Sequence, residues 1–269
     1  MRGICVGLVA MGLASAALGQ NVVLSDGNSD AFFNVTGGNQ VGWTVDGVNQ
    51  LFNQRFYYRA AGFADEVAVD SLPLNGFQAS DTNLFDDPRN DTLFTRHTDA
   101  AGIRFDIRYN LAGGTAGSGA ADLGELITIN NTGNTTQTIS FFQYVDFDLG
   151  GTPGGDIGRI IGGRIADQID ALGTFSVNET VVTPAPSHYE LNTFPNLVAK
   201  FSDGLVTDLT DVAGPLAGDV TWGFQWDFVL APGDVFLISK DKRLEQVPAP
   251  AGVALVGLTG LVAMGRRRR

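Results

Sequence analysis

Cysteine, histidine and lysine are scarce in this chain of 269 residues. Its one cysteine is Cys5, near the amino terminus, so neither a disulfide framework nor a cysteine-ligated metal site is expected. Two histidines, His97 and His188, are too few for a site built on three imidazoles. The net charge of −12 argues against nucleic acid as a partner, because a phosphate-binding surface needs clustered basic residues.

Recognisable catalytic motifs are also lacking. Ser118 has alanine two positions before it, where the nucleophile elbow of hydrolases requires glycine. His97 and His188 have no serine or cysteine partner in a known motif, and each is expected to be a surface or strand-end histidine. No phosphate loop or dinucleotide fingerprint is present. The sequence therefore predicts no catalytic residue and no enzyme.

The first 19 residues have the pattern of an export signal. Arg2 provides the positive start, Ile4–Leu13 is apolar, and small residues then offer a cleavage point after Gly19. We expect signal peptidase to remove residues 1–19, which would leave a mature protein without cysteine. The alternative is an uncut membrane anchor at the amino terminus.

The carboxyl-terminal tail, residues 247–269, differs equally from the middle of the chain. A Pro248-Ala249-Pro250 sequence precedes an apolar stretch, residues 251–265, and four arginines end the chain: Arg266, Arg267, Arg268 and Arg269. As a helix this stretch would be about 22 Å long, against a hydrocarbon core of roughly 30 Å. Arginines that reach the interface can cover the difference. The pattern predicts transient or permanent insertion into the inner membrane, with the arginines on the cytoplasmic side.

In the order of its three parts, this tail resembles the PEP-CTERM sorting signal of Gram-negative bacteria. The resemblance implies recognition by an exosortase, a membrane transpeptidase-like protease that removes the tail and passes the protein to the cell surface or the extracellular matrix. The middle residue of the motif is usually glutamate and is Ala249 here. A permanently anchored protein therefore remains the alternative.

Residues 20–246 have the pattern of β-structure. Large apolar residues occupy alternate positions over 222–230 and 103–111, and Phe52, Phe56 and Tyr58 are expected to share one strand face. Turn-forming residues at 130–134 and at Pro232-Gly233 predict hairpins between neighbouring strands. These features predict a single antiparallel domain of the β-sandwich or jelly-roll type.

The aromatic residues raise the question of a sugar-binding platform. Trp222 and Trp226 share a strand face with Phe224 and Phe228, which favours a place in the core. Trp43 lies near a turn and is the tryptophan expected to be most open.

Three aspartates are the sharpest polar cluster in the sequence. Asp146 and Asp148 lie two apart at the end of a predicted strand, and a glycine-rich loop leads from them to Asp156. The simpler interpretation is that these are solvent-facing aspartates beside a turn. The alternative is a calcium site, because carboxylates and turn carbonyls are the hard oxygen ligands that calcium prefers. A pair of these carboxylates for glycoside hydrolysis is a further alternative.

The sequence as a whole predicts an exported, non-catalytic protein of the cell surface or matrix. All 29 acidic residues lie between the two terminal signals, so the exported part would be strongly acidic. The alternatives are a secreted hydrolase that acts on polysaccharide and a module that binds calcium or glycan, with extracellular polysaccharide as the partner. No other cofactor is expected.

Overall fold

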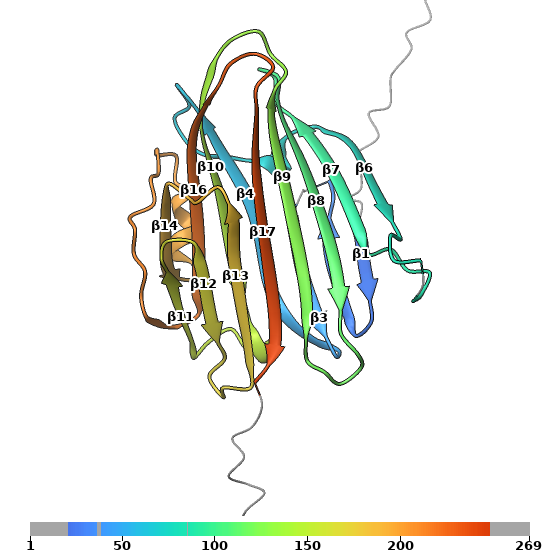
Figure 1. Ribbon diagram of the computed structural model, residues 1–269. Coiled ribbons are helices and arrows are strands. Elements are labelled where there is room, and N and C mark those ends of the chain that lie inside the picture. Colours follow the sequence, from blue (N-terminus) through green and yellow to red (C-terminus); the bar gives the residue numbers. More distant parts are fainter. Residues whose placement is uncertain (1–20, 37–38, 85, 248–269) are drawn as a thin grey trace, which may run out of the picture.

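The computed structural model describes residues 21–247, apart from positions 37, 38 and 85. Over this range the chain forms two antiparallel sheets stacked face to face, with very little helix (Figure 1). The predicted all-β sandwich is therefore confirmed. The predicted signal segment, residues 1–19, and the predicted sorting residues, 248–269, lie outside the described residues. Within the described residues, no helix has the length and apolar character needed to cross a membrane.

The first sheet, sheet A, has eight strands. They are β1 (Asn21–Asp26), β2 (Ser29–Asn34), β3 (Asn39–Val45), β4 (Val48–Ala60), β5 (Val67–Ala68), β10 (Gln137–Phe147), β14 (His188–Thr193) and β16 (Val220–Leu230). Their order across the sheet is β1-β2-β3-β4-β10-β16-β14, and β5 pairs with β4.

The second sheet, sheet B, has nine strands. They are β6 (Leu74–Ser80), β7 (Thr92–Thr98), β8 (Ile103–Gly113), β9 (Ala121–Asn131), β11 (Asp156–Ile161), β12 (Ile165–Ile169), β13 (Phe175–Thr183), β15 (Leu216–Gly218) and β17 (Val235–Gln246). Their order is β15-β11-β12-β13-β17-β9-β8-β7-β6. The helical turns are η1 (Val69–Ser71), η2 (Leu149–Gly151) and α1 (Asn196–Lys200).

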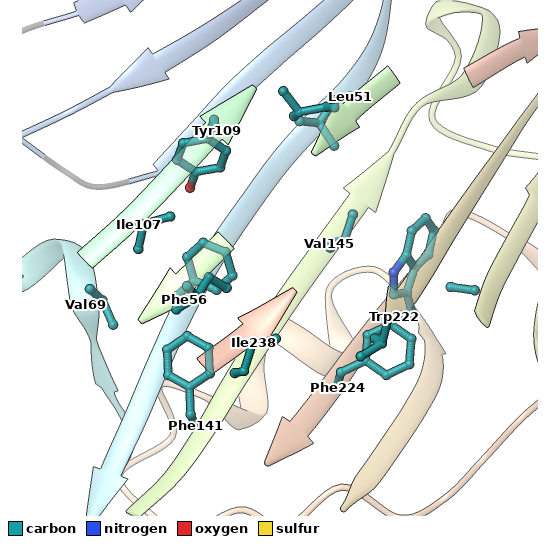
Figure 2. Close-up of a cluster of buried hydrophobic side chains, with 14 of the residues drawn as sticks. Leu51, Phe56, Val69, Ile107, Tyr109, Phe141, Val145, Trp222, Phe224 and Ile238 are labelled. Atoms are coloured by element: carbon teal, nitrogen blue, oxygen red, sulfur yellow. The ribbon is translucent and has the colours of Figure 1, made fainter. Parts of the chain in front are cut away.

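The main core lies between the sheets, where alternate residues of each strand point inward. On β16, Trp222, Phe224 and Trp226 are buried on one face, as the alternation predicted. Trp222 stacks on Phe147 of β10, with ring centroids 5.4 Å apart. Figure 2 shows Trp222 and Phe224 in a cluster of buried side chains that come from both sheets.

Two residues that were expected near the surface are buried. Trp43 is enclosed by the core, and its Nε1 donates a hydrogen bond to Ser29 Oγ at 2.8 Å. The tryptophan can lie inside because its one polar group finds a partner there. His97 is also buried, since it occupies an inward position of β7. The expectation of an open Trp43 was therefore wrong. Of the two places expected for His97, the surface was wrong and the strand end is confirmed, because His97 is the next-to-last residue of β7.

Two connections predicted as hairpins cross between the sheets instead. Residues 132–136 join β9 of sheet B to β10 of sheet A, and residues 231–234 join β16 of sheet A to β17 of sheet B. In the sheets, β10 pairs with β4 and β16, while β17 pairs with β9 and β13. Turn residues specify a reversal of direction, which a hairpin and a crossover both need, so they could not identify the pairing.

A second apolar cluster covers the outer face of sheet A. Tyr57 of β4 and Phe142 of β10 point away from sheet B, and the segment that contains α1 packs Phe201 over them. Phe201 stacks on Tyr57, with ring centroids 4.8 Å apart. Because of this cover, residues 141–147 of β10 are buried on both faces of the sheet.

Candidate functional site

A pocket of about 230 Å³ opens at one end of sheet A. The strand register explains why distant residues meet there. Asp146 of β10 lies opposite Asn53 of β4 and Thr221 of β16, and Thr221 lies opposite Asn192 of β14. Residues beside this row, together with the loop after β10, line the pocket: Phe52, Asp146, Asp148, Pro153, Phe194 and Asp219.

A β-bulge turns Phe52 into the pocket. The sequence pattern placed Phe52 on the same face as Phe56 and Tyr58, but the register between β4 and β10 shifts at Asp146 and Phe147. A bulge adds a residue to one strand, so the inward and outward positions exchange beyond it. Phe56 and Tyr58 are buried, whereas 53% of the Phe52 surface is exposed. The predicted shared face was therefore wrong for Phe52.

Phe194 is the second aromatic residue of the pocket. It follows β14, and its backbone N–H donates a hydrogen bond to Asp219 O at 2.9 Å. Its ring meets that of Phe52 edge to face, with centroids 6.2 Å apart and planes at 74°. Since 43% of Phe194 is exposed, the pair presents an apolar surface to solvent beside the carboxylates.

Three carboxylates gather in the pocket. Asp146, Asp148 and Asp219 each have an oxygen within 4.8 Å of the others. Asp146 is only 2% exposed; Tyr144 Oη donates a hydrogen bond to its Oδ2 at 2.9 Å, and its Oδ1 has no hydrogen-bond partner among the described residues. The interpretation of solvent-facing aspartates was therefore wrong for Asp146.

The pocket raises the pKa of all three carboxyl groups. For Asp146, burial has the largest effect, the hydrogen bond from Tyr144 acts against it, and the charges of Asp219 and Asp148 add to it. The result is a pKa of about 7. Burial and the charge of Asp219 raise the pKa of Asp148, and burial raises that of Asp219. The site therefore combines a carboxyl group that exchanges its proton near neutral pH with two carboxyl groups whose pKa is raised.

The third predicted residue, Asp156, lies outside this cluster. It begins β11 in sheet B and is buried, and its Oδ2 accepts a hydrogen bond from Gln168 Nε2 at 2.5 Å. Burial raises its pKa to about 6. The structure thus brings Asp146 and Asp148 together as predicted, but Asp219 joins them where Asp156 was expected. The glycine-rich loop supplies Pro153 to the pocket instead of an acid.

Sequence reasoning missed Phe52, Phe194 and Asp219. Asp219 lies between β15 and β16, which belong to different sheets, and is 71 positions from Asp148 in the sequence. An aspartate directly before the aromatic strand at 220–230 was the only signal available for it. Its neighbours depend on strand order, which no local pattern encodes.

No protein-family model matches this chain, and no curated protein matches its sequence. Solved structures do match its fold. A bacterial glucoamylase complexed with acarbose has a TM-score of 0.53 at 9% identity, over 92% of this chain and 36% of that one. This chain thus spans about a third of that enzyme's length.

Two further structures match over nearly their whole length. A putative aldose 1-epimerase from Escherichia coli K12 has a TM-score of 0.50 at 13% identity, over 85% of this chain and 99% of that one. A Synechocystis protein has a TM-score of 0.53 at 11% identity, over 89% of this chain and all of that one. At these identities the similarity establishes the fold alone. The chain shares the β-sandwich fold found in these proteins.

Proposed function

We propose that this chain is an exported carbohydrate-binding protein that holds one sugar ring in the pocket between Phe52 and Phe194. The observation that carries the proposal is the meeting of two exposed aromatic rings and three carboxylates around one cavity. Ligand sites combine apolar walls with a few convergent polar groups in this way. The glucoamylase and the putative aldose 1-epimerase with the same fold lend support, because their names indicate sugar substrates.

The two halves of the pocket match the two kinds of surface on a sugar. The C–H face of a sugar ring is apolar and packs against an aromatic ring, while its hydroxyl groups donate hydrogen bonds to carboxylate oxygens. Asp146 Oδ1 has no hydrogen-bond partner among the described residues and is available for such a bond. The cavity of about 230 Å³ is below the roughly 300–1,000 Å³ of sites for drug-sized ligands. It therefore suits one ring of a glycan and not an extended chain.

The test is a glycan array, followed by titration calorimetry with the best ligand. We expect Phe52→Ala and Phe194→Ala each to weaken binding about five-fold, because an aromatic contact contributes about 1 kcal/mol. Both side chains are exposed, so their removal should leave the melting temperature nearly unchanged.

Leu84→Ala is the matched control, because Leu84 is 75% exposed and does not line the pocket. A failure to bind any glycan, or an unchanged affinity in both phenylalanine variants, would refute the proposal.

We also propose the acidic cluster as a calcium site, with Asp219 in place of Asp156. Two oxygen ligands on opposite sides of one calcium ion lie about 5 Å apart. One oxygen from each of the three carboxyl groups lies within 4.8 Å of the others, which is a compatible spacing. The unpartnered Oδ1 of the buried Asp146 supports this assignment. Calcium should raise the melting temperature of the native protein but not that of Asp146→Asn. Absence of binding heat in a calcium titration would remove the ion and leave the sugar proposal intact.

Catalysis on sugar is the second candidate function, favoured by the pKa of about 7 at Asp146. A carboxyl group that exchanges its proton near neutral pH can act as a general acid or base. One oxygen of each carboxyl group lies within 4.8 Å of the others, so the spacing does not favour an inverting glycosidase, which has about 6.5–9.5 Å between its two groups. Polarimetry of a freshly dissolved sugar anomer, together with a reducing-sugar assay, tests this candidate. Activity that disappears in Asp146→Asn would support catalysis, and no activity would leave binding alone.

Export and sorting are proposed from residues 1–19 and 247–269. Signal peptidase would release the mature chain, and an exosortase-like protease would cut near Pro248-Ala249-Pro250 to deliver it to the surface or matrix. The intact mass of the protein from its native envelope and medium tests both cuts. A mass that includes Arg269 would mean that the tail remains as a membrane anchor.

A further inference from the structure

A buried polar cluster lies between the sheets, apart from the sugar pocket. Lys240 and Lys242 of β17, Glu125 of β9 and Glu179 of β13 have side chains with no exposed surface. Gln54 of β4 and Gln143 of β10 complete it from sheet A, and both are fully buried. Placing two lysines and two glutamates in an apolar core is costly, so a merely stabilising role does not account for them well.

Within this cluster, three reactive groups touch one another. Lys242 Nζ contacts both Gln54 Oε1 and Glu125 Oε1, and Gln54 Nε2 donates a hydrogen bond to Glu125 Oε1 at 2.9 Å. The carboxamide carbon of Gln54 is one bond of about 1.23 Å from the oxygen that the lysine contacts. The amine of Lys242 and the carboxamide of Gln54 are thus held together out of water, and the carboxylate of Glu125 contacts both.

The ionisation of these groups suits acyl transfer. Burial lowers the pKa of Lys242, which favours the neutral amine that acts as a nucleophile. Burial opposes ionisation of Glu125, but the charges of Lys240 and Lys242 outweigh it and lower the Glu125 pKa. Glu125 is therefore ionised, and its Oε1 contacts the lysine nitrogen that must lose a proton.

We propose that Lys242 and Gln54 join in an isopeptide bond, with Glu125 as the proton carrier. Lys242 first gives a proton to Glu125, and the free amine then attacks the Gln54 Cδ. The Nζ–Cδ bond forms and the Cδ–Nε2 bond breaks, with its electron pair leaving on nitrogen. Glu125 relays protons to that nitrogen, and the products are a secondary amide and ammonium. No oxidant, metal or co-substrate is consumed.

The neighbouring lysine provides an internal comparison. Lys240 Nζ contacts Glu125 at 2.5 Å and Glu179 at 3.0 Å. Gln143 Nε2 also binds Glu179, at 2.6 Å, but Gln143 Oε1 has no hydrogen-bond partner among the described residues. Because Lys240 does not contact the Gln143 carboxamide oxygen, we expect one cross-link and not two.

The cross-link would join β4 of sheet A to β17 of sheet B. It would close a loop between positions that are 188 residues apart, in a chain whose described part contains no cysteine. Such a bond limits the unfolded state as a disulfide does, and it is insensitive to reducing agents. This inference is independent of the sugar pocket and stands or falls separately from it.

Peptide mass spectrometry of the full-length protein after trypsin digestion tests the proposal. We expect Asp241–Arg243 to be joined covalently to the peptide that ends at Arg55, with the loss of one ammonia. The intact mass alone does not decide, because an amino-terminal Gln20 can also lose ammonia by cyclising. If trypsin instead cuts after Lys242, and the peptide that ends at Arg55 is found only at its unmodified mass, the proposal is overturned. This comparison needs no variant.

Variants then assign the roles. Lys242→Met, Gln54→Met and Glu125→Gln should each abolish the linked peptide. Lys240→Met should retain the cross-link, in a longer peptide that begins at Phe201 because trypsin no longer cuts before Asp241. A linked peptide that persists in Glu125→Gln would refute the role of Glu125 as the proton carrier. Circular dichroism of each variant establishes that it has folded before its peptides are compared.

Discussion

The ionisation of Asp146 shows how a single residue depends on its place in the fold. An aspartate at a strand end is ordinarily exposed and ionised at neutral pH, but the outer cover of sheet A buries this one and the strand register brings two other acids beside it. The same residue type at Asp148 is less buried and is affected less. The residue type at one position therefore does not determine whether its side chain is ionised, because the groups packed around it shift its pKa.

At the scale of this residue, we predict a pH-dependent cost in stability. Below about pH 4 Asp146 is protonated in both the folded and the unfolded state. Between the ordinary pKa of 3.8 and about 7, only the folded state keeps the proton, so the free energy of unfolding falls as pH rises and levels off above pH 7. One pKa unit corresponds to about 1.4 kcal/mol, so a rise from 3.8 to about 7 amounts to roughly 4 kcal/mol.

Urea unfolding at pH 4, 6 and 8 in the presence of a chelator measures this slope. Buried Asp156, whose pKa is raised to about 6, adds to the slope below pH 6, so the change between pH 6 and 8 is the part expected to reflect Asp146. Asp146→Asn should lose that part, and its stability relative to the native protein should be higher at pH 8 than at pH 4. If the variant has the same pH dependence as the native protein, Asp146 is not the group responsible.

Elements depend on irregularities as much as on regular pairing. The bulge in β4 exposes Phe52, and α1 with its flanking residues 194–212 covers the remaining outer face of sheet A. This segment has little secondary structure of its own. The aromatic contacts of Phe201 hold it in place, together with the ion pairs of Asp208 with Arg59 and of Lys200 with Glu190. The segment also carries Phe194, and its attachment therefore positions one wall of the pocket.

For this element, we predict that Phe201→Ala detaches the cover. Phe201 is 1% exposed and packs on Tyr57 and Phe142, so the truncation should cost about 3–5 kcal/mol. Hydrogen exchange should accelerate over residues 194–212 more than in β8 or β9. Leu205→Ala, in the same segment but 66% exposed, should change neither quantity. A uniform loss of protection over the whole chain would argue against a locally attached cover.

The whole molecule is held together by apolar packing and by polar contacts that bridge its sheets. Glu179 of sheet B accepts hydrogen bonds from Trp222 Nε1 at 2.8 Å and Gln143 Nε2 at 2.6 Å, both in sheet A, and pairs with Lys240. These directional contacts fix how one sheet lies on the other, which apolar contacts alone do less specifically.

At this scale, we predict that Glu179→Leu destabilises the entire domain. The variant removes one of the two carboxylate partners of the buried Lys240 and the acceptor of two buried N–H groups, which should cost about 3–5 kcal/mol. Chemical unfolding followed by tryptophan fluorescence measures the loss. The control variant is Glu245→Leu on β17, the strand that pairs with β13. It removes an exposed ion pair with Arg243 and should cost less than about 1 kcal/mol. Equal losses in the two variants would contradict a bridging role for Glu179.

The sequence by itself determined the all-β class, the inward face of Trp222, Phe224 and Trp226, and the closeness of Asp146 to Asp148. These follow from alternation and spacing along one strand, which are local properties. Only the tertiary structure decided that the turns at 132–136 and 231–234 cross between sheets, that Trp43 is buried, and that Phe52, Phe194 and Asp219 complete the pocket. Each of these depends on strand order, register and a bulge. Those features are fixed by which distant strands bury each other's apolar faces, so no short stretch of sequence specifies them.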